Sequence, residues 1–156
     1  MTSYAHTRLF LAKMLGLQIK AIDPMVYLML NNTPVLRNRF WVRPDPEAID
    51  HVLPSLGDLW SAALLAYISD FCLLGPALTQ RPNFRITKMV SLNHTMWFFA
   101  NRTLRSPSEW IFMDLSLIHS SNNVFLVDCQ LWSEDRQRLL AVCNQQGLVR
   151  PAKKHN

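Results

Sequence analysis

The stretch "VSLNHTMWFF", residues 90–99, has three adjacent polar side chains in the middle of a segment that otherwise has the composition of a β-strand. They are Asn93, His94 and Thr95. An unpaired polar group costs roughly 1–3 kcal/mol when it is buried, so these side chains are expected to face partners. The sequence alone leaves open which partners these three side chains face.

Two further polar side chains lie in apolar surroundings. Gln145 occurs in "LLAVCNQQGLVR", residues 139–150, and Asp70 lies inside "LWSAALLAYISDFCLLGPAL", residues 59–78. From the residues alone, Gln145 is interpreted as a hydrogen-bonded residue at a strand edge. Asp70 must be paired or neutral in such a helix. A structural hydrogen bond is the simpler interpretation of Asp70, and a carboxyl that faces a ligand is the functional one.

The histidines and cysteines do not have the spacing of metal ligands. The five histidines are far apart, and the three cysteines have no C-x-x-C spacing, so we expect neither a metal nor a cofactor. An odd number of cysteines in apolar runs indicates reduced, buried thiols and an intracellular compartment. The cysteines are Cys72, Cys129 and Cys143.

Composition and charge indicate one globular domain without a nucleic-acid-binding arm. The chain has 156 residues, of which 49% are hydrophobic and 17% charged. The net charge of +5 is carried by scattered residues, with no block of like charges and no nucleic-acid-binding signature. A solvated basic surface is the simpler interpretation, and attraction of small anionic ligands is the alternative.

The apolar stretch 59–78 has the length of a membrane span, but its composition favours a buried helix. Asp70 falls in its middle, where a carboxylate would cost roughly 2.5–3.5 kcal/mol in a bilayer. Gly75 and Pro76 also interrupt it. We therefore predict a helix wrapped by the rest of the domain and no membrane span. The N-terminal segment has only weak transit-peptide character, and no clear targeting signal is present.

Periodicity predicts two strands, one long buried helix and then four antiparallel strands. An N-terminal arm or linker remnant (1–16) precedes this single domain (17–150), and a tail (151–156) follows it. A single sheet with one apolar helix must wrap that helix to bury it, which predicts an α+β fold. The expected elements are strands 17–23 and 39–44, a helix from about 57 to 74 with Asp58 as its N-cap, and strands 87–100, 109–118, 123–133 and 138–150.

Four segments, in this order, resemble the second, C-terminal hotdog domain of the acyl-CoA thioesterase II family. They are "FWVRP" (40–44), "AYISDFCLLGPAL" (66–78), "MVSLNHTMWFF" (89–99) and "LLAVCNQQGLVR" (139–150). The resemblance covers roughly residues 17–150 and implies a hotdog fold, an antiparallel sheet wrapped round one long helix. The first hotdog of the family is not represented, so a shortened family product is one hypothesis.

The resemblance also implies a chemistry and the positions that carry it. The family hydrolyses fatty acyl-CoA with a water activated by an Asp, a Ser or Thr hydroxyl, and a Gln. The Gln falls on Gln145, and the Asp falls on Asn93. The hydroxyl position falls on Leu117 or Ile118. Alternation puts Ser116 on the same face as Ile118, so Ser116 can substitute only if the position is Ile118.

These differences imply reduced activity. Asn93 cannot accept a proton at neutral pH, and a positioned general base is typically worth about 10²–10⁴-fold in rate. His94 could in principle substitute as a base, but alternation places it on the other face of the strand from Asn93, so a structural hydrogen bond is the preferred interpretation. The implied site is therefore Asn93, Gln145 and Ser116 as catalytic positions, with Asp70 and His94 as candidate substrate-binding residues.

Two functions follow from the resemblance. The first is a thioesterase of reduced activity that converts fatty acyl-CoA to free fatty acid and CoA. The second is a non-catalytic acyl-CoA-binding or regulatory subunit. In either case a lone hotdog is expected to form a homodimer or to pair with another hotdog subunit, because its sheet would otherwise expose an edge. A cytoplasmic or peroxisomal location is expected from the family.

Overall fold

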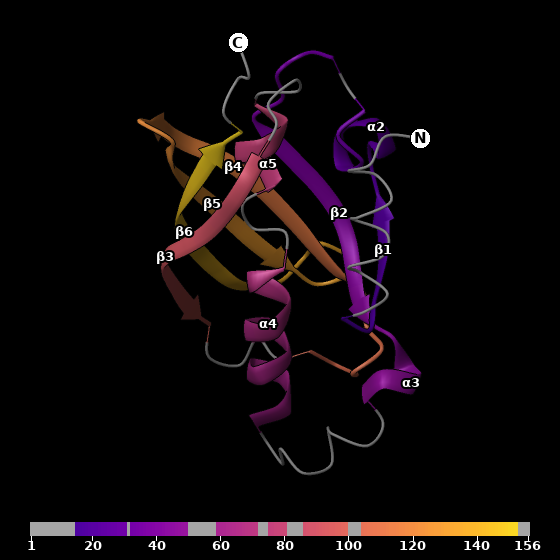
Figure 1. Cartoon of the computed structure of the whole chain (residues 1–156). Helices are drawn as coiled ribbons and strands as arrows, with labels where there is room; N and C mark the ends of the chain where they lie inside the picture. Colours follow the sequence, from indigo (N-terminus) through magenta and orange to yellow (C-terminus); the bar gives the residue numbers. More distant parts are fainter. Residues whose placement is uncertain are drawn as a thin grey trace.

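Six strands and four short helices make up the part of the chain that the computed structural model describes, which is residues 15–30, 32–49, 59–71, 75–80, 86–99 and 104–152 (Figure 1). The expected arm before residue 15 and the last four residues lie outside this part. The elements are β1 (Leu17–Ala21), α2 (Pro24–Tyr27), β2 (Arg37–Pro44), α3 (Pro46–Ile49), α4 (Trp60–Asp70), α5 (Gly75–Thr79), β3 (Ile86–Phe98), β4 (Ile111–Ser121), β5 (Val124–Trp132) and β6 (Leu139–Pro151).

All six strands form one antiparallel sheet in the order β1-β2-β4-β5-β6-β3. Alternation along β5 sends Val127 and Cys129 to a buried face and leaves Asp128 and Gln130 half-buried on the other. We call these the inner and outer faces of the sheet. The two expected strands, the helix and the four later strands are all present, so the predicted α+β fold is confirmed.

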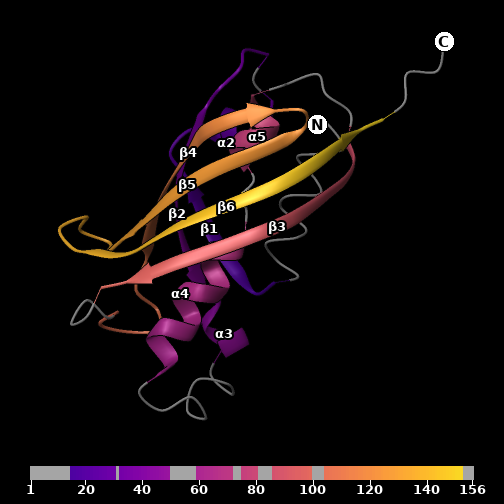
Figure 2. The same cartoon turned by 90° about the vertical axis from the view of Figure 1, so that its left-hand side faces the viewer.

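The helix α4 lies in the middle of the molecule, with β1 and β2 to one side of it and β3 and β6 to the other (Figure 1). The turned view shows the curved sheet above α4, with the N-terminal part of the helix extending below the strands (Figure 2). Leu64, Leu65 and Ile68 recur at helical spacing and are buried against the inner face. By length and composition the stretch Trp60–Thr79 could cross a membrane, but 60% of it is buried inside the molecule, as expected for a core helix.

The ends of this helix differ from the prediction. The expected N-cap Asp58 and the expected last turn, residues 72–74, lie outside the described residues. The described helix ends at Asp70, where Phe71 has an extended backbone. Gly75 and Pro76 were expected to interrupt the helix; α4 ends before them, and they begin the separate short helix α5. Proline suits the first turn of a helix, because its missing N–H has no intrahelical partner there.

Two hairpins connect the last three strands. Asn122 and Asn123 form the two-residue turn between β4 and β5, and both have positive φ angles, which asparagine tolerates. The β5–β6 connection contains Glu134 to Gln137, the residues between the last two expected strands. In this loop Asp135 accepts hydrogen bonds from Ser133 Oγ and Gln137 N, which together lower the pKa of Asp135.

The strand β3 lies at the edge of the sheet and contains a β-bulge. Ser91 pairs with Gly147 and Asn93 pairs with Gln146, so Leu92 is the extra residue between them. A bulge places two residues opposite one and therefore reverses the alternation of every residue that follows it. The bulge decides which polar residues of "VSLNHTMWFF" face the helix.

Candidate active site

Gln145 lies on the inner face of β6 and is the largest buried polar residue of the described part, with 1% of its surface exposed. Its Nε2 donates to Asp70 Oδ1 at 2.8 Å and to Ser91 Oγ at 2.7 Å. An amide that faces a carboxylate must present its NH₂ group, which fixes the orientation of this side chain. One amide thus joins the last residue of α4, the middle of β3 and β6.

The bulge at Leu92 brings Ser91 and His94 to the inner face. Ser91 precedes the bulge and bonds to Gln145, and His94 follows it and pairs directly with Gln145 in the sheet register. Without the bulge, alternation from Ser91 would have turned Asn93 toward Gln145 and His94 away from it.

Asn93 is instead on the outer face. It is exposed and pairs with the exposed Gln146, and its Oδ1 accepts a hydrogen bond from Thr95 Oγ1 at 3.0 Å. The structure therefore does not bring Asn93 and Gln145 together. The polar residues of the opening stretch face two directions, with His94 inside and Asn93 and Thr95 outside.

His94 is held by the last turn of α4. Its Nε2 lies 3.2 Å from Ser69 Oγ, and Ser69 Oγ also lies 2.8 Å from the carbonyl of Ala66 and 3.0 Å from Met96 Sδ. A hydroxyl has one hydrogen, and the Ala66 carbonyl is its nearest acceptor, so we assign His94 Nε2 as the donor to Ser69. This bond links β3 to the helix beside Asp70.

The residues considered for the hydroxyl position lie in β4. Ser116 pairs with Asp128 on the outer face, so it is not near Gln145. A second bulge falls between Leu117 and His119, and Ile118 within it is 59% exposed. The structure thus separates Ser116 from the Gln145 site.

Sequence reasoning did not single out Ser91. Its hydroxyl lies two residues before Asn93, inside the quoted stretch, but strand alternation alone places both on the same face. A bulge has no strong sequence signal here, because the extra residue is Leu92, an ordinary strand former. Asp70 was identified as a carboxyl that needed a partner, and its partner is Gln145.

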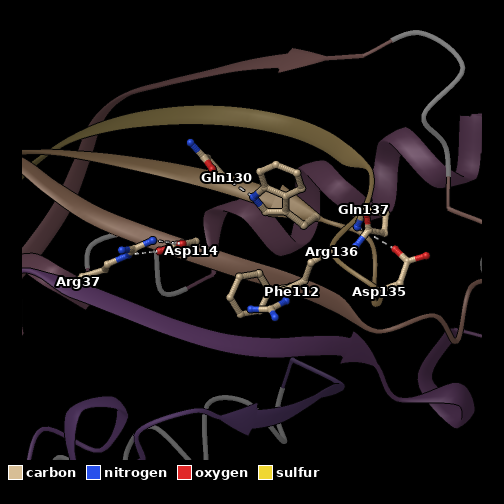
Figure 3. A pocket seen from close by; sticks show the side chains of 8 residues that line it. Arg37, Phe112, Asp114, Gln130, Asp135, Arg136 and Gln137 are labelled. Atoms are coloured by element: carbon tan, nitrogen blue, oxygen red, sulfur yellow. Dashed lines mark hydrogen bonds and ion pairs between the residues drawn. The ribbon is translucent and has the colours of Figure 1, made fainter.

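A separate hollow of about 410 Å³ lies on the outer face, between β2, β4, β5 and the β5–β6 loop (Figure 3). Its two cations are balanced by two carboxylates, and Arg37 is already paired with Asp114 through Nε–Oδ1 at 2.7 Å. The hollow therefore has no excess positive charge for a phosphate. Its lining residues are Arg37, Phe112, Asp114, Gln130, Trp132, Asp135, Arg136 and Gln137.

The two described cysteines are opposite each other on the inner face. Cys129 of β5 pairs with Cys143 of β6, and both are buried free thiols. Burial, together with the adjacent Cys143 thiol, raises the pKa of Cys129 well above its ordinary value. Cys72 lies outside the described residues. Within the described ranges no three His, Cys, Asp or Glu side chains are grouped as metal ligands would be.

Comparison with known proteins matches most of the chain. A family model described as the acyl-CoA thioesterase C-terminal domain matches residues 26–149. The rat protein acyl-coenzyme A thioesterase 8 is 31% identical over 143 residues, which are 89% of this chain and 41% of the rat protein. The chain therefore spans less than half the length of this relative.

Solved structures share the fold. The acyl-CoA thioesterase II TesB2 from Mycobacterium marinum has a TM-score of 0.68 at 22% identity, over 90% of this chain and 52% of that one. A Streptococcus mutans protein bound to acetyl CoA has a TM-score of 0.57 at 11% identity, over 88% of this chain and 92% of that one. At these identities the likeness shows the hotdog fold.

Proposed function

Because the chain belongs to the acyl-CoA thioesterase family through its C-terminal hotdog domain, we propose that it hydrolyses fatty acyl-CoA to the free fatty acid and CoA. The observation that carries this proposal is the position of Gln145. The family glutamine is retained, is buried on the inner face, and is held by a carboxylate and a hydroxyl at the end of the central helix. These are the groups that polarise and orient a water.

The ligand we propose is an acyl-CoA. Family membership supports it, as does the fold likeness to a Streptococcus mutans protein bound to acetyl CoA. The net charge of +5 would favour the approach of the CoA phosphates. The balanced charges of the outer hollow make that hollow a poor phosphate site, so we expect the thioester to approach the inner face.

We also propose that turnover is lower than that of a chain with the family carboxylate. Asn93 cannot take a proton and lies on the outer face away from Gln145, and Leu117 and Ile118 have no hydroxyl. Introducing Asn93→Asp and comparing the turnover numbers tests this reason for the reduction. An increase of about tenfold or more would trace the reduction to position 93, whereas an unchanged rate would mean that other groups activate the water.

The first test is thiol release from a panel of acyl-CoA substrates, from acetyl-CoA to palmitoyl-CoA, by the purified native chain. We expect release above the spontaneous rate for at least one chain length. Calorimetric titration with CoA and a non-hydrolysable acyl-CoA analogue accompanies it. Binding of the analogue without any release would overturn hydrolysis and leave a non-catalytic acyl-CoA-binding subunit as the function.

The proposed partner is a second hotdog, from another copy of this chain or from a related subunit. β3 is an edge strand, and within the described part of the chain no strand pairs with its other side. Leu92 and Trp97 of this strand are 54% and 51% exposed. Such an edge promotes pairing with another sheet. Size-exclusion chromatography with light scattering should find a dimer, and a stable monomer at micromolar concentration would contradict this expectation.

We propose an intracellular location, in the cytoplasm or in peroxisomes. The buried free thiols of Cys129 and Cys143 support a reducing compartment. Microscopy of a tagged full chain against organelle markers tests it, and a signal confined to the secretory pathway would contradict it.

A further inference from the structure

We propose that the outer face of the sheet binds a single-stranded nucleic acid, which crosses β2, β4 and β5 with its bases on aromatic side chains and its phosphates on arginine and lysine. The cations concerned are scattered in the sequence, but strand pairing gathers them on one face. This binding is separate from the proposed hydrolysis, because Gln145 and its hydrogen bonds lie on the inner face.

A row of aromatic side chains crosses the outer face. Trp41 of β2 pairs with Phe112 of β4, which pairs with Trp132 of β5, so all three point to the same side of the sheet. The ring centres of Trp41 and Phe112 are 5.1 Å apart. Trp41 and Trp132 are half-buried and lie two strand spacings, about 10 Å, apart. Aromatic rings on a sheet can stack with bases whatever the base sequence.

The row leads into the outer hollow. Phe112 and Trp132 both line this hollow of about 410 Å³ (Figure 3). Gln130 accepts a hydrogen bond from Trp132 Nε1 at 3.2 Å, which fixes the indole at the wall of the hollow. A base that stacks on Trp132 would therefore enter a recess, while the strand continues over the neighbouring tryptophan.

Cations flank this row on β1 and β2. Lys20 lies on the outer face of β1, and Arg39 and Arg43 lie on the outer face of β2, one on each side of Trp41 in sequence. None of the three cations has a carboxylate partner in the part of the chain that the structure describes. Asp114 pairs with Arg39 in the sheet register, but another arginine already bonds to both of its oxygens. These three cations can therefore attract phosphates.

Two of these cations are held in place by an indole ring. The Lys20 ammonium lies 4.1 Å and the Arg43 guanidinium 4.5 Å from the centre of the Trp110 ring. Arg43 Nε donates to Gln18 Oε1 at 2.9 Å, which leaves its two terminal nitrogens as donors. Side chains that are already ordered lose less conformational entropy on binding. The corner of β1 and β2 thus presents positioned donors to phosphate oxygens.

The aromatic row and the cations together favour one class of ligand. A second copy of this chain would bring the same unpaired cations against each other, which like-charge repulsion disfavours. An acidic protein segment would satisfy the cations, but its carboxylates have no flat ring to match the aromatic row. A single-stranded nucleic acid presents phosphates and unstacked bases together, whereas a duplex hides the faces of its bases.

The test is fluorescence anisotropy of a labelled twelve-residue oligothymidylate mixed with the purified native chain. We expect saturable binding with a Kd of roughly 1–100 μM at about 50 mM salt. The affinity should fall as salt is raised, with a logarithmic slope of about −0.7 for each phosphate contacted. Polyglutamate of the same length carries the charge without the bases, and it should bind at least about fivefold more weakly.

Three variants locate the binding. Trp132→Ala removes a stacking ring and should weaken binding of the oligothymidylate about fivefold or more. Arg39→Gln removes an exposed cation, and it should weaken binding about threefold or more and make the salt slope shallower by about 0.7. Arg150→Gln is the matched control. It removes the same charge from an exposed position at the far end of β6 from the residue that pairs with Trp132, and Kd should stay within about twofold.

Several results would overturn the inference. They are an absence of binding to the oligothymidylate, equally tight binding of polyglutamate, or native affinity in both Trp132→Ala and Arg39→Gln. An equal loss in Arg150→Gln would also overturn it, because binding would then depend on net charge alone. If near-ultraviolet circular dichroism shows that Trp132→Ala does not fold, the contrast between Arg39→Gln and Arg150→Gln decides.

Discussion

Two neighbouring residues of β6, Asn144 and Gln145, each donate an amide hydrogen bond to an aspartate, but on opposite faces of the sheet. Asn144 bonds to Asp128 on the outer face, between two strands that the backbone ladder already joins. Gln145 bonds to Asp70 on the inner face, between the sheet and the central helix. The chemistry of the two pairs is nearly the same, so burial and the elements joined decide what each pair does.

The outer pair adds little that the sheet does not already have. Both of its strands are fixed by their register, and solvent competes for half-buried polar groups. The inner pair fixes the helix end relative to two strands, and it places a carboxylate and a hydroxyl beside a buried amide. Position in the fold, more than residue type, separates the two amide–carboxylate pairs.

The largest expected difference between substitutions on the inner face and on the outer face is in the free energy of unfolding. Leu115 of β4 is fully buried on the inner face, and its neighbour Ser116 lies on the outer face. We expect Leu115→Ala to lower the free energy of unfolding by about 2–5 kcal/mol through lost burial and a residual cavity. Ser116→Ala should change it by less than about 0.5 kcal/mol. Urea unfolding followed by circular dichroism measures both, and similar losses would contradict the assignment of faces.

The next effect should be on turnover. Gln145→Leu removes the amide that orients Asp70 and Ser91, and we expect kcat to fall about 10²–10³-fold. Asn144→Leu removes the outer amide and should leave kcat within about twofold. Thiol release by the two purified variants checks this contrast. A loss of similar size in Asn144→Leu would mean that the outer face takes part in the reaction.

A smaller effect should appear as a pH dependence of stability. Burial raises the pKa of the Cys129 thiol, whereas in the unfolded chain this thiol has a pKa of about 8.5. Above that pH the unfolded chain loses the thiol proton that the folded chain keeps. Below it, the free energy of unfolding keeps its full value. It should fall by up to about 1.4 kcal/mol per pH unit above it.

Urea unfolding at intervals between pH 7 and 10 tests the direction of this change, with Cys129→Ala as the control. The control should have a shallower slope at alkaline pH. A slope equal to that of the native chain would show that Cys129 does not contribute. Labelling of native protein with a thiol reagent should also leave Cys129 unmodified until the chain unfolds, because the thiol is buried.

The smallest effect should come from the ion pair of the outer hollow. Arg37 is 58% exposed and bonds to Asp114 with two of its nitrogens, which raises the pKa of Arg37 (Figure 3). Exposure allows solvent and salt to screen the pair. A double-mutant cycle of Arg37→Ala and Asp114→Ala should give a coupling energy below about 1 kcal/mol, decreasing at 1 M NaCl. A salt-independent coupling above about 2 kcal/mol would show that this part of the outer face is shielded from solvent.

Much of the fold follows from local patterns. The alternation of β5 predicts its faces, the apolar run around Leu64 and Ile68 predicts a wrapped helix, and the four later strands follow from their composition. The site was only partly predictable. Asp70 was identified as a carboxyl in need of a partner, but the partner belongs to a strand 75 residues away, and that pairing depends on how the sheet curls around α4.

Which side chains of β3 face inward could not be predicted by alternation. Counting by twos from Ser91 places Asn93 and Thr95 on its face, whereas the structure places His94 there. Edge position, strand twist and contacts with β6 and α4 together decide whether the strand forms a bulge. None of these is local in the sequence.

The bulge also has a consequence for the length of the chain. Because Leu92 is the extra residue and is mostly exposed, its removal would leave Ser91, Asn93 and His94 opposite the same partners as before. Position 92 can therefore absorb the loss of one residue, whereas a deletion in the middle of β5 would turn every following side chain to the wrong face. The edge strand β3 therefore tolerates the loss of one residue, whereas the central strands tolerate substitutions only.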